Sequence, residues 1–198
     1  MLSQKTKYRI PLKSPEKWTF FAFICFVLLS YIIQSFNPEF KELMVLSLDD
    51  YFFQIQIFTY AFIHKNLLHL ISNIILFIIL YSFMIKCFNW KFTWVIFCIG
   101  ILFGGLGFLL LPNSNSSSYI MGISAGNLGW FLTLWYYYPK SQLKFANFTI
   151  QFQLLIILIL IFHISSFIID KSNSWQAHIG SIFVLPLFII NSIIRKTK

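Results

Sequence analysis

The chain has 198 residues, of which 58% are hydrophobic and 11% charged, and its mean hydropathy is +0.76. Soluble domains carry about a quarter charged residues, so this composition excludes a water-soluble globular protein and indicates one embedded in a lipid bilayer. The formal net charge is +9. The basic residues lie in short segments between apolar runs, which argues against a nucleic-acid partner.

Six apolar segments reach the length of about 20 residues that a helix needs to cross a bilayer. They are residues 18–36, 66–85, 92–111, 119–138, 145–169 and 172–194. Lys and Arg concentrate on the cytoplasmic side of membrane proteins. Here 12 of the 15 basic residues lie on one side, in residues 1–17, 86–91, 140–144 and 195–198.

The sequence therefore predicts an all-α membrane protein, a bundle of six transmembrane helices with both termini in the cytoplasm. We expect a basic cytoplasmic arm at residues 1–17, a membrane domain at 18–194 and a basic tail at 195–198. The cell membrane is the expected location. The connection at residues 37–63 would lie outside, in the membrane interface, because it is partly apolar, with a short amphipathic helix.

Polar side chains converge near the predicted outer face. The second, fourth and sixth segments all begin outside, and they carry His69 and Asn73, Ser124, and His178 respectively. At 1.5 Å per residue these groups share a depth of roughly 5–10 Å below the surface. Ionisable groups within a membrane are costly and are functional candidates by default.

Ser124 lies among small residues, in the run Gly122-Ile123-Ser124-Ala125-Gly126. Such a cluster is either an ordinary helix-packing face or the turn that carries a nucleophile. His69 and Asn73 are spaced i, i+4 and project from one helix face. They could both donate to a developing oxyanion or could satisfy each other and tie helices together.

A serine nucleophile needs a general base, and histidine is the natural one. His178 and His163 both lie at a suitable depth, so depth alone does not choose between them. His64, at the outer edge of the second segment, is interpreted as a loop anchor. The odd number of cysteines, three, and the lack of an HExxH pair and of a carboxylate at this depth argue against a metal site, and no cofactor is expected.

Taken together, these motifs resemble the rhomboid family of intramembrane serine proteases. The resemblance runs from about residue 58 to 181 and is carried by His64-x4-His69-x3-Asn73, by Gly122-x-Ser124 and by Ala177-His178. It implies that Ser124 is the nucleophile and His178 its base, in a dyad without an acidic third member. It further implies that His69, Asn73 and the Ser124 backbone N–H bind the oxyanion. Gly122 and Gly126 would be structural near the site, and His64 would stabilise the first outer loop.

Several positions depart from the family pattern. Ile55-Gln56 stands where a Trp-Arg pair is usual, and Leu128 replaces an aromatic residue that often stacks on the histidine. Ser181 stands in place of a glycine after the histidine, with Gly180 one position early, and Leu185 replaces a small residue. These departures concern loop packing, the histidine's orientation and the closeness of the fourth and sixth helices.

The implied activity is cleavage of transmembrane helices of membrane-protein substrates near their outer ends. The substrate helix would enter beside the fifth segment, which makes His163 peripheral. The alternative is a catalytically inactive rhomboid-like protein that binds or escorts membrane clients. A transporter is the weakest hypothesis, because the inner halves of the six segments hold almost no ionisable residues for an ion route.

Overall fold

A computed structural model describes residues 14–48, 53–111, 119–138, 142–145, 148–151 and 175–186. His163, Asp170, most of the predicted fifth span, most of the N-terminal arm and the C-terminal tail lie outside these residues. In chain order the elements are α1 (Ser14–Phe36), α2 (Pro38–Met44), β1 (Leu46–Ser47), α3 (Phe53–Thr59), the 3-10 helix η1 (Tyr60–Phe62), α4 (Leu67–Cys87), α5 (Trp90–Leu110), β2 (Tyr119–Ile120), α6 (Ser124–Tyr137), β3 (Gln142–Phe145), β4 (Phe148–Gln151) and α8 (Trp175–Ile182).

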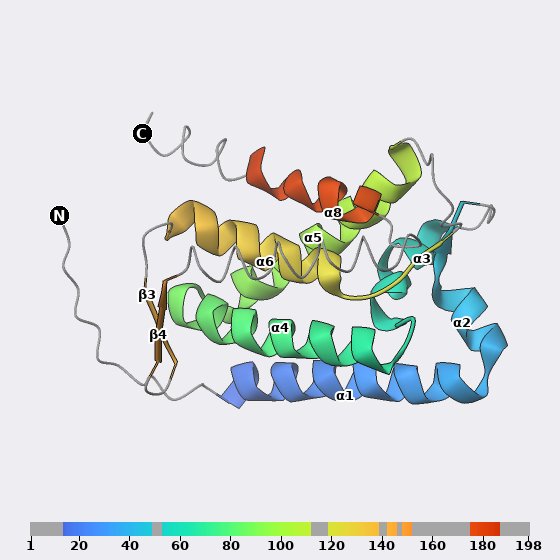
Figure 1. Cartoon of the computed structure of the whole chain (residues 1–198), viewed down its shortest axis with the longest axis horizontal. Helices are drawn as coiled ribbons and strands as arrows, with labels where there is room; N and C mark the ends of the chain where they lie inside the picture. The colour runs from blue at the N-terminus through green and yellow to red at the C-terminus, as the bar shows by residue number, and fades with distance from the viewer. Residues whose placement is uncertain are drawn as a thin grey trace.

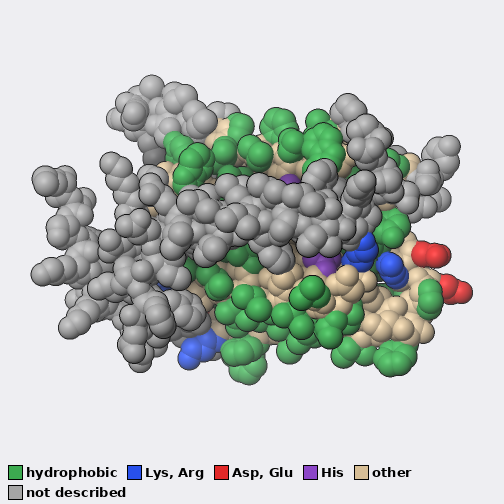
Figure 2. Space-filling model, viewed as in Figure 1, with side chains coloured by type: hydrophobic (Ala, Val, Ile, Leu, Met, Phe, Trp, Pro, Cys, Tyr) green, Lys and Arg blue, Asp and Glu red, His purple; other side chains and the backbone are tan. Residues whose placement is uncertain are grey.

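Three of the described helices are long and apolar enough to cross a membrane: Pro15–Phe36, Leu67–Cys87 and Trp90–Leu110. They match the first three predicted spans, with small differences at the ends. Most of the apolar part of α1 is not buried inside the protein, and large apolar side chains such as Phe21 are exposed. Figure 2 shows apolar side chains covering much of the described surface of one face, with acidic side chains at one end. Such a surface requires lipid around it.

The described chain is mostly helical, but the predicted starts of the fourth and fifth spans are wrong. β1 pairs antiparallel with β2, so the segment predicted to span from residue 119 begins as a strand and becomes helical at Ser124. β3 pairs antiparallel with β4, so residues 145 and 148–151 form part of a hairpin rather than the start of a fifth helix. Phe148, Thr149 and Ile150 are aromatic or β-branched and favour the extended backbone.

Asparagine fixes the start of three helices. Asn37, Asn66 and Asn89 are the N-caps of α2, α4 and α5, and each side-chain oxygen accepts a backbone N–H three residues later. The bonds measure 3.1, 2.8 and 2.9 Å in that order. An Asn cap supplies an acceptor for one of the orphan N–H donors at a helix N-terminus. The short α2 and α3 lie within residues 37–63, where a short helix was expected.

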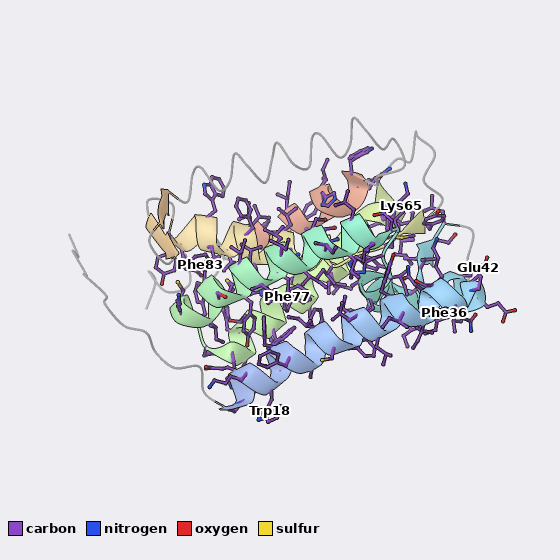
Figure 3. The ribbon with its side chains drawn as sticks, turned by 60° about the horizontal axis from the view of Figure 1, so that its bottom comes forward. Trp18, Phe36, Glu42, Lys65, Phe77 and Phe83 are labelled. Carbon is purple, nitrogen blue, oxygen red and sulfur yellow. The ribbon has the colours of Figure 1, made fainter. Side chains whose placement is uncertain are left out.

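The helices pack as a bundle around α5, which contacts α3, α4, α6 and α8. Figure 1 shows α1 running alongside α4, with α6 and α8 on the other side of α4 from α1. α4, α6 and α8 all begin at the end of the molecule where α2 and α3 lie. In Figure 3 Lys65, which precedes α4, lies near this same end, as do Phe36 and Glu42, while Trp18 marks the opposite end of α1.

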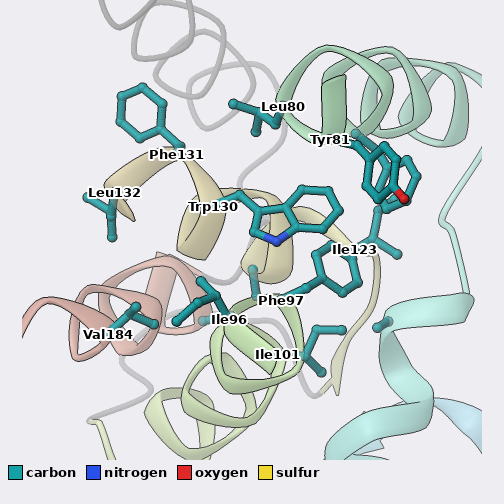
Figure 4. Packing of buried hydrophobic residues seen from close by; sticks show 14 of the residues in the cluster. Leu80, Tyr81, Ile96, Phe97, Ile101, Ile123, Trp130, Phe131, Leu132 and Val184 are labelled. Atoms are coloured by element: carbon teal, nitrogen blue, oxygen red, sulfur yellow. The ribbon is translucent and has the colours of Figure 1, made fainter. Parts of the chain in front are cut away.

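Aromatic side chains hold these helices together. Trp130 of α6 is fully buried, its ring centroid lying 4.6 Å from Phe97 and 5.1 Å from Phe77. Its indole N–H donates to the Thr93 carbonyl at 2.6 Å. Figure 4 shows Trp130 pointing between Phe97 and Tyr81. Buried ring pairs of this kind add about 0.5–1.5 kcal/mol each beyond their area, and they fix α6 against α4 and α5.

Candidate active site

α6 begins at Ser124, and the residues just before it form a constrained turn. Gly122 has a φ of +104°, a conformation that L side chains rarely adopt. Its backbone N–H donates to the Tyr60 carbonyl at 2.9 Å. The Tyr60 hydroxyl in turn donates to the Ile101 carbonyl on α5 at 2.7 Å. η1 and α5 therefore hold the turn that carries Ser124.

The first turns of α4 face this turn. A Cβ atom placed on Gly122 would lie 2.9 Å from His69 Cε1, 3.1 Å from His69 Nε2 and 3.3 Å from Asn73 Nδ2. His69 and Asn73, the predicted i, i+4 pair, thus lie beside Gly122, two residues before Ser124. Asn73 Nδ2 is buried and has no hydrogen-bond partner among the described residues. A buried donor left unpaired costs about 1–3 kcal/mol, so this amide is available to an incoming acceptor.

α8 meets α6 on the surface of α5. A Cβ atom on Gly104 would lie 2.6 Å from Ala125 Cβ and 3.2 Å from the Ala177 carbonyl oxygen. Ala125 directly follows Ser124, and Ala177 directly precedes His178. The immediate neighbours of the two predicted reacting residues therefore both lie against Gly104. Ser124 and His178 are both partly exposed.

A second glycine contact sets the spacing of α5 and α8. A Cβ on Gly107 would lie 2.5 Å from Gly180 Cα and 2.6 Å from the Gln176 carbonyl oxygen, both backbone atoms. The backbones are therefore as close as glycine permits, as in small-residue packing between membrane helices. Gly180 occupies this contact, one position before the family's usual glycine.

Ser181 fits the bundle by hydrogen bonding. Its side chain is fully buried, and its hydroxyl donates to the Ala177 carbonyl at 2.9 Å and to the Gly100 carbonyl at 3.2 Å. The departure from glycine therefore adds a polar contact between α8 and α5. Leu128 and Leu185 are partly buried and pack against the hydrophobic core.

His64 lies buried between the end of η1 and the start of α4. Its backbone N–H donates to Gln34 Oε1 at 3.0 Å, and Gln34 Nε2 donates back to the His64 carbonyl, which ties α1 to this loop. The His64 ring lies 5.3 Å from that of His69. Burial, and secondarily the charge of His69, lower the pKa of His64 to about 3, while the Phe62 backbone acts in the opposite direction. His64 is therefore neutral at physiological pH.

The loop also replaces the expected Trp-Arg pair with other contacts. Gln56 is buried, and its Nε2 donates to the Leu43 carbonyl at 3.3 Å. The Thr59 hydroxyl donates to the Met44 carbonyl at 2.9 Å. These bonds hold α3 against the end of α2.

The sequence analysis predicted α5 as a span but missed the glycine face by which it contacts α6 and α8. Gly100, Gly104 and Gly107 line the α5 face that contacts α6 and α8. Their Gly-x3-Gly-x2-Gly spacing in an apolar segment could have indicated it, because helical spacing places small residues on one face. Asn127, a buried polar residue on α6, was also missed.

Within the described part of the chain, no group of three or more His, Cys, Asp or Glu side chains could hold a metal ion. The polar residues gathered here are instead a serine, an amide and imidazoles. This donor set suits acyl transfer, which needs a nucleophile, a base and oxyanion donors.

The long apolar helices with outward-facing apolar side chains define an integral membrane protein of helical type. The family model of the Rhomboid domain matches residues 53–190, which covers more than half of the chain and includes α3 through α8. The chain therefore belongs to the rhomboid family, as the sequence motifs indicated. A comparison with curated proteins finds no significant match.

Proposed function

We propose that this protein is an intramembrane serine endopeptidase that cleaves transmembrane helices of membrane proteins near their outer ends. Ser124 is the nucleophile and His178 the general base. His69, Asn73 and the Ser124 backbone N–H stabilise the oxyanion. The proposal includes a six-span bundle in the cell membrane with both termini in the cytoplasm.

The observation that carries this proposal is the buried, unpaired Asn73 amide beside His69 and the turn before Ser124. A non-catalytic helix contact would have no reason to leave a buried donor unpaired, whereas an oxyanion site must do so until substrate arrives. Ser124 is the first residue of α6, so its own N–H is one of the orphan donors of that helix. The side chains of His69 and Asn73 on α4 lie beside Gly122, two residues before this N–H, which supports a shared oxyanion site.

In the proposed reaction, Ser124 Oγ attacks the scissile carbonyl carbon and its proton passes to His178. The carbonyl oxygen becomes an oxyanion between His69, Asn73 and the Ser124 N–H. Collapse breaks the C–N bond, and His178 gives its proton to the leaving amine. Water then attacks the acyl-serine, with His178 again as base. The substrate helix must first unwind locally, because its carbonyls are hydrogen-bonded within the helix.

The test combines cleavage of a model transmembrane substrate with fluorophosphonate labelling of purified protein. We expect cleavage and labelling by the wild type, and loss of both in Ser124→Ala. Full cleavage by Ser124→Ala would overturn the assignment. A folded wild type that neither cleaves nor labels would favour the inactive client-binding alternative.

The base is tested separately with His178→Ala and His163→Ala. We expect His178→Ala to abolish cleavage and His163→Ala to retain most of it. The reverse pattern would assign the base to His163.

A further inference from the structure

Asn127 is a fully buried polar residue on α6, one helical turn after Ser124. Its Nδ2 donates to the main-chain carbonyl of Asn73 on α4 at 3.1 Å. Because a backbone carbonyl only accepts, the end of the Asn127 amide that faces it must be the NH2 group. This hydrogen bond therefore joins the helix of the proposed nucleophile to the helix of a proposed oxyanion donor.

The hydrogen bond from Asn127 is additional to the backbone hydrogen bonds within α4. Asn73 lies inside α4, where its carbonyl already has a backbone partner one turn on, so it does not need Asn127. Asn127 Oδ1 is buried without a hydrogen-bond partner among the described residues, which is unfavourable. An apolar side chain would avoid that penalty. The amide therefore joins α6 to α4 while leaving one of its own polar atoms unpaired among the described residues.

Asn73 lies close to two residues that flank Ser124 in the sequence, Gly122 before it and Asn127 after it. Upstream, its side-chain Nδ2 lies 3.3 Å from the Cβ position of Gly122. Downstream, its backbone accepts from Asn127. Three residues of rigid helix, about 4.5 Å of rise, separate Ser124 from Asn127. The hydrogen bond from Asn127 to Asn73, together with the short turn from Gly122 to Ser124 and the helical turn from Ser124 to Asn127, thus restrains the position of Asn73 relative to Ser124.

We propose that Asn127 is a positioning residue that acts through Asn73, setting the oxyanion donor at its distance from Ser124. This inference rests on the proposed protease function. It assigns no contact between Asn127 and the substrate. Its effect is on transition-state stabilisation, so it lowers kcat rather than raising KM.

The experiment compares kcat, KM and unfolding temperature for Asn127→Leu, with Asn127→Ala as a second variant in case the larger residue prevents folding. We expect kcat to fall about tenfold to a hundredfold, as small displacements of catalytic groups cause, with KM and unfolding temperature near those of the wild type. Asn127→Gln, which keeps the amide donor, should recover part of the loss.

A double-mutant cycle separates positioning from stability. In an Asn73→Ala background the carbonyl that Asn127 binds is still present, but the proposed oxyanion donor is gone. We therefore expect Asn127→Leu to change kcat by less than about threefold there, since coupled residues are not additive. An equal fall in kcat in both backgrounds would overturn the proposal.

Thr133→Val is the matched control. Thr133 is also buried on α6, and its hydroxyl donates to a main-chain carbonyl, that of Gly129 at 2.7 Å, within the same helix. We expect Thr133→Val to leave kcat unchanged. A loss of kcat like that of Asn127→Leu would refute a specific role. If the wild type itself cleaves nothing, the proposed function fails; if it cleaves and Asn127→Leu matches it, this inference alone fails.

Discussion

Both the fold and the proposed chemistry depend on Gly122 having no Cβ atom. Replacing it by alanine places a Cβ 2.9 Å from His69 Cε1, where ordinary contacts begin at 3.4 Å. The imidazole must therefore retreat by about 0.5 Å to regain a van der Waals separation. The same Cβ would stand 3.3 Å from Asn73 Nδ2, in front of the unpaired donor.

Two costs follow from Gly122→Ala. The backbone φ of +104° strains an alanine by about 1–3 kcal/mol, which lowers the free energy of unfolding. Displacing His69 and obstructing Asn73 would weaken the proposed oxyanion binding, and loss of one such donor costs about 100-fold or more in kcat. We expect a folded protein with a lower unfolding temperature and kcat reduced about 100-fold.

The assay is cleavage of a model transmembrane substrate in liposomes, with thermal unfolding measured on the same preparation. Gly105→Ala is the control, because its Cβ would lie 2.8 Å from Ile57 Cγ1, a comparable clash whose close contacts include neither His69 nor Asn73, and without a positive φ. It should lose stability and keep its kcat. Equal kcat for folded Gly122→Ala and Gly105→Ala would refute the reasoning.

Three further predictions concern neighbouring contacts. His64 has a pKa of about 3 in the folded protein and an ordinary pKa of 6.5 in the unfolded chain, so between these values the unfolded chain binds the proton and the folded chain does not. The free energy of unfolding should fall by about 2 kcal/mol from pH 6.5 to 5, a slope that His64→Phe removes; an unchanged slope would contradict this. Gly107→Ala pushes against backbone atoms of α8 and should cost about 1–3 kcal/mol in thermal unfolding, with loss of cleavage; wild-type cleavage would exclude this role. Ser181→Ala removes its bond to Gly100 and should cost about 1 kcal/mol in the same unfolding assay while cleavage persists; loss of cleavage would show that Ser181 also orients His178.

Much of the fold follows from local sequence. Apolar runs of spanning length predict α1, α4 and α5, because a backbone in lipid must satisfy its own hydrogen bonds. Asparagines at the starts of helices predict where two of these helices begin. The motifs containing His69, Asn73, Ser124 and His178 predicted the rhomboid family, which the family match confirms.

The strands escaped prediction for a physical reason. β1 and β2 are two residues each, far apart in sequence, and each is extended because the other is present. The pattern of apolar residues along the sequence does not indicate such a pairing. β4 lies within the apolar run predicted to span from residue 145, and hydropathy does not separate a strand from a helix there.

The sequence by itself determined that the chain is a helical membrane protein of the rhomboid family and which polar residues lie at one end of its helices. Only the tertiary structure decided which helix faces meet. In lipid every face of a helix can be apolar, so hydrophobicity does not choose a neighbour, whereas close backbone approach does. The α5 glycines bring α6 and α8 together, and Asn127 joins α6 to α4. These contacts bring together the helices that carry the motif residues.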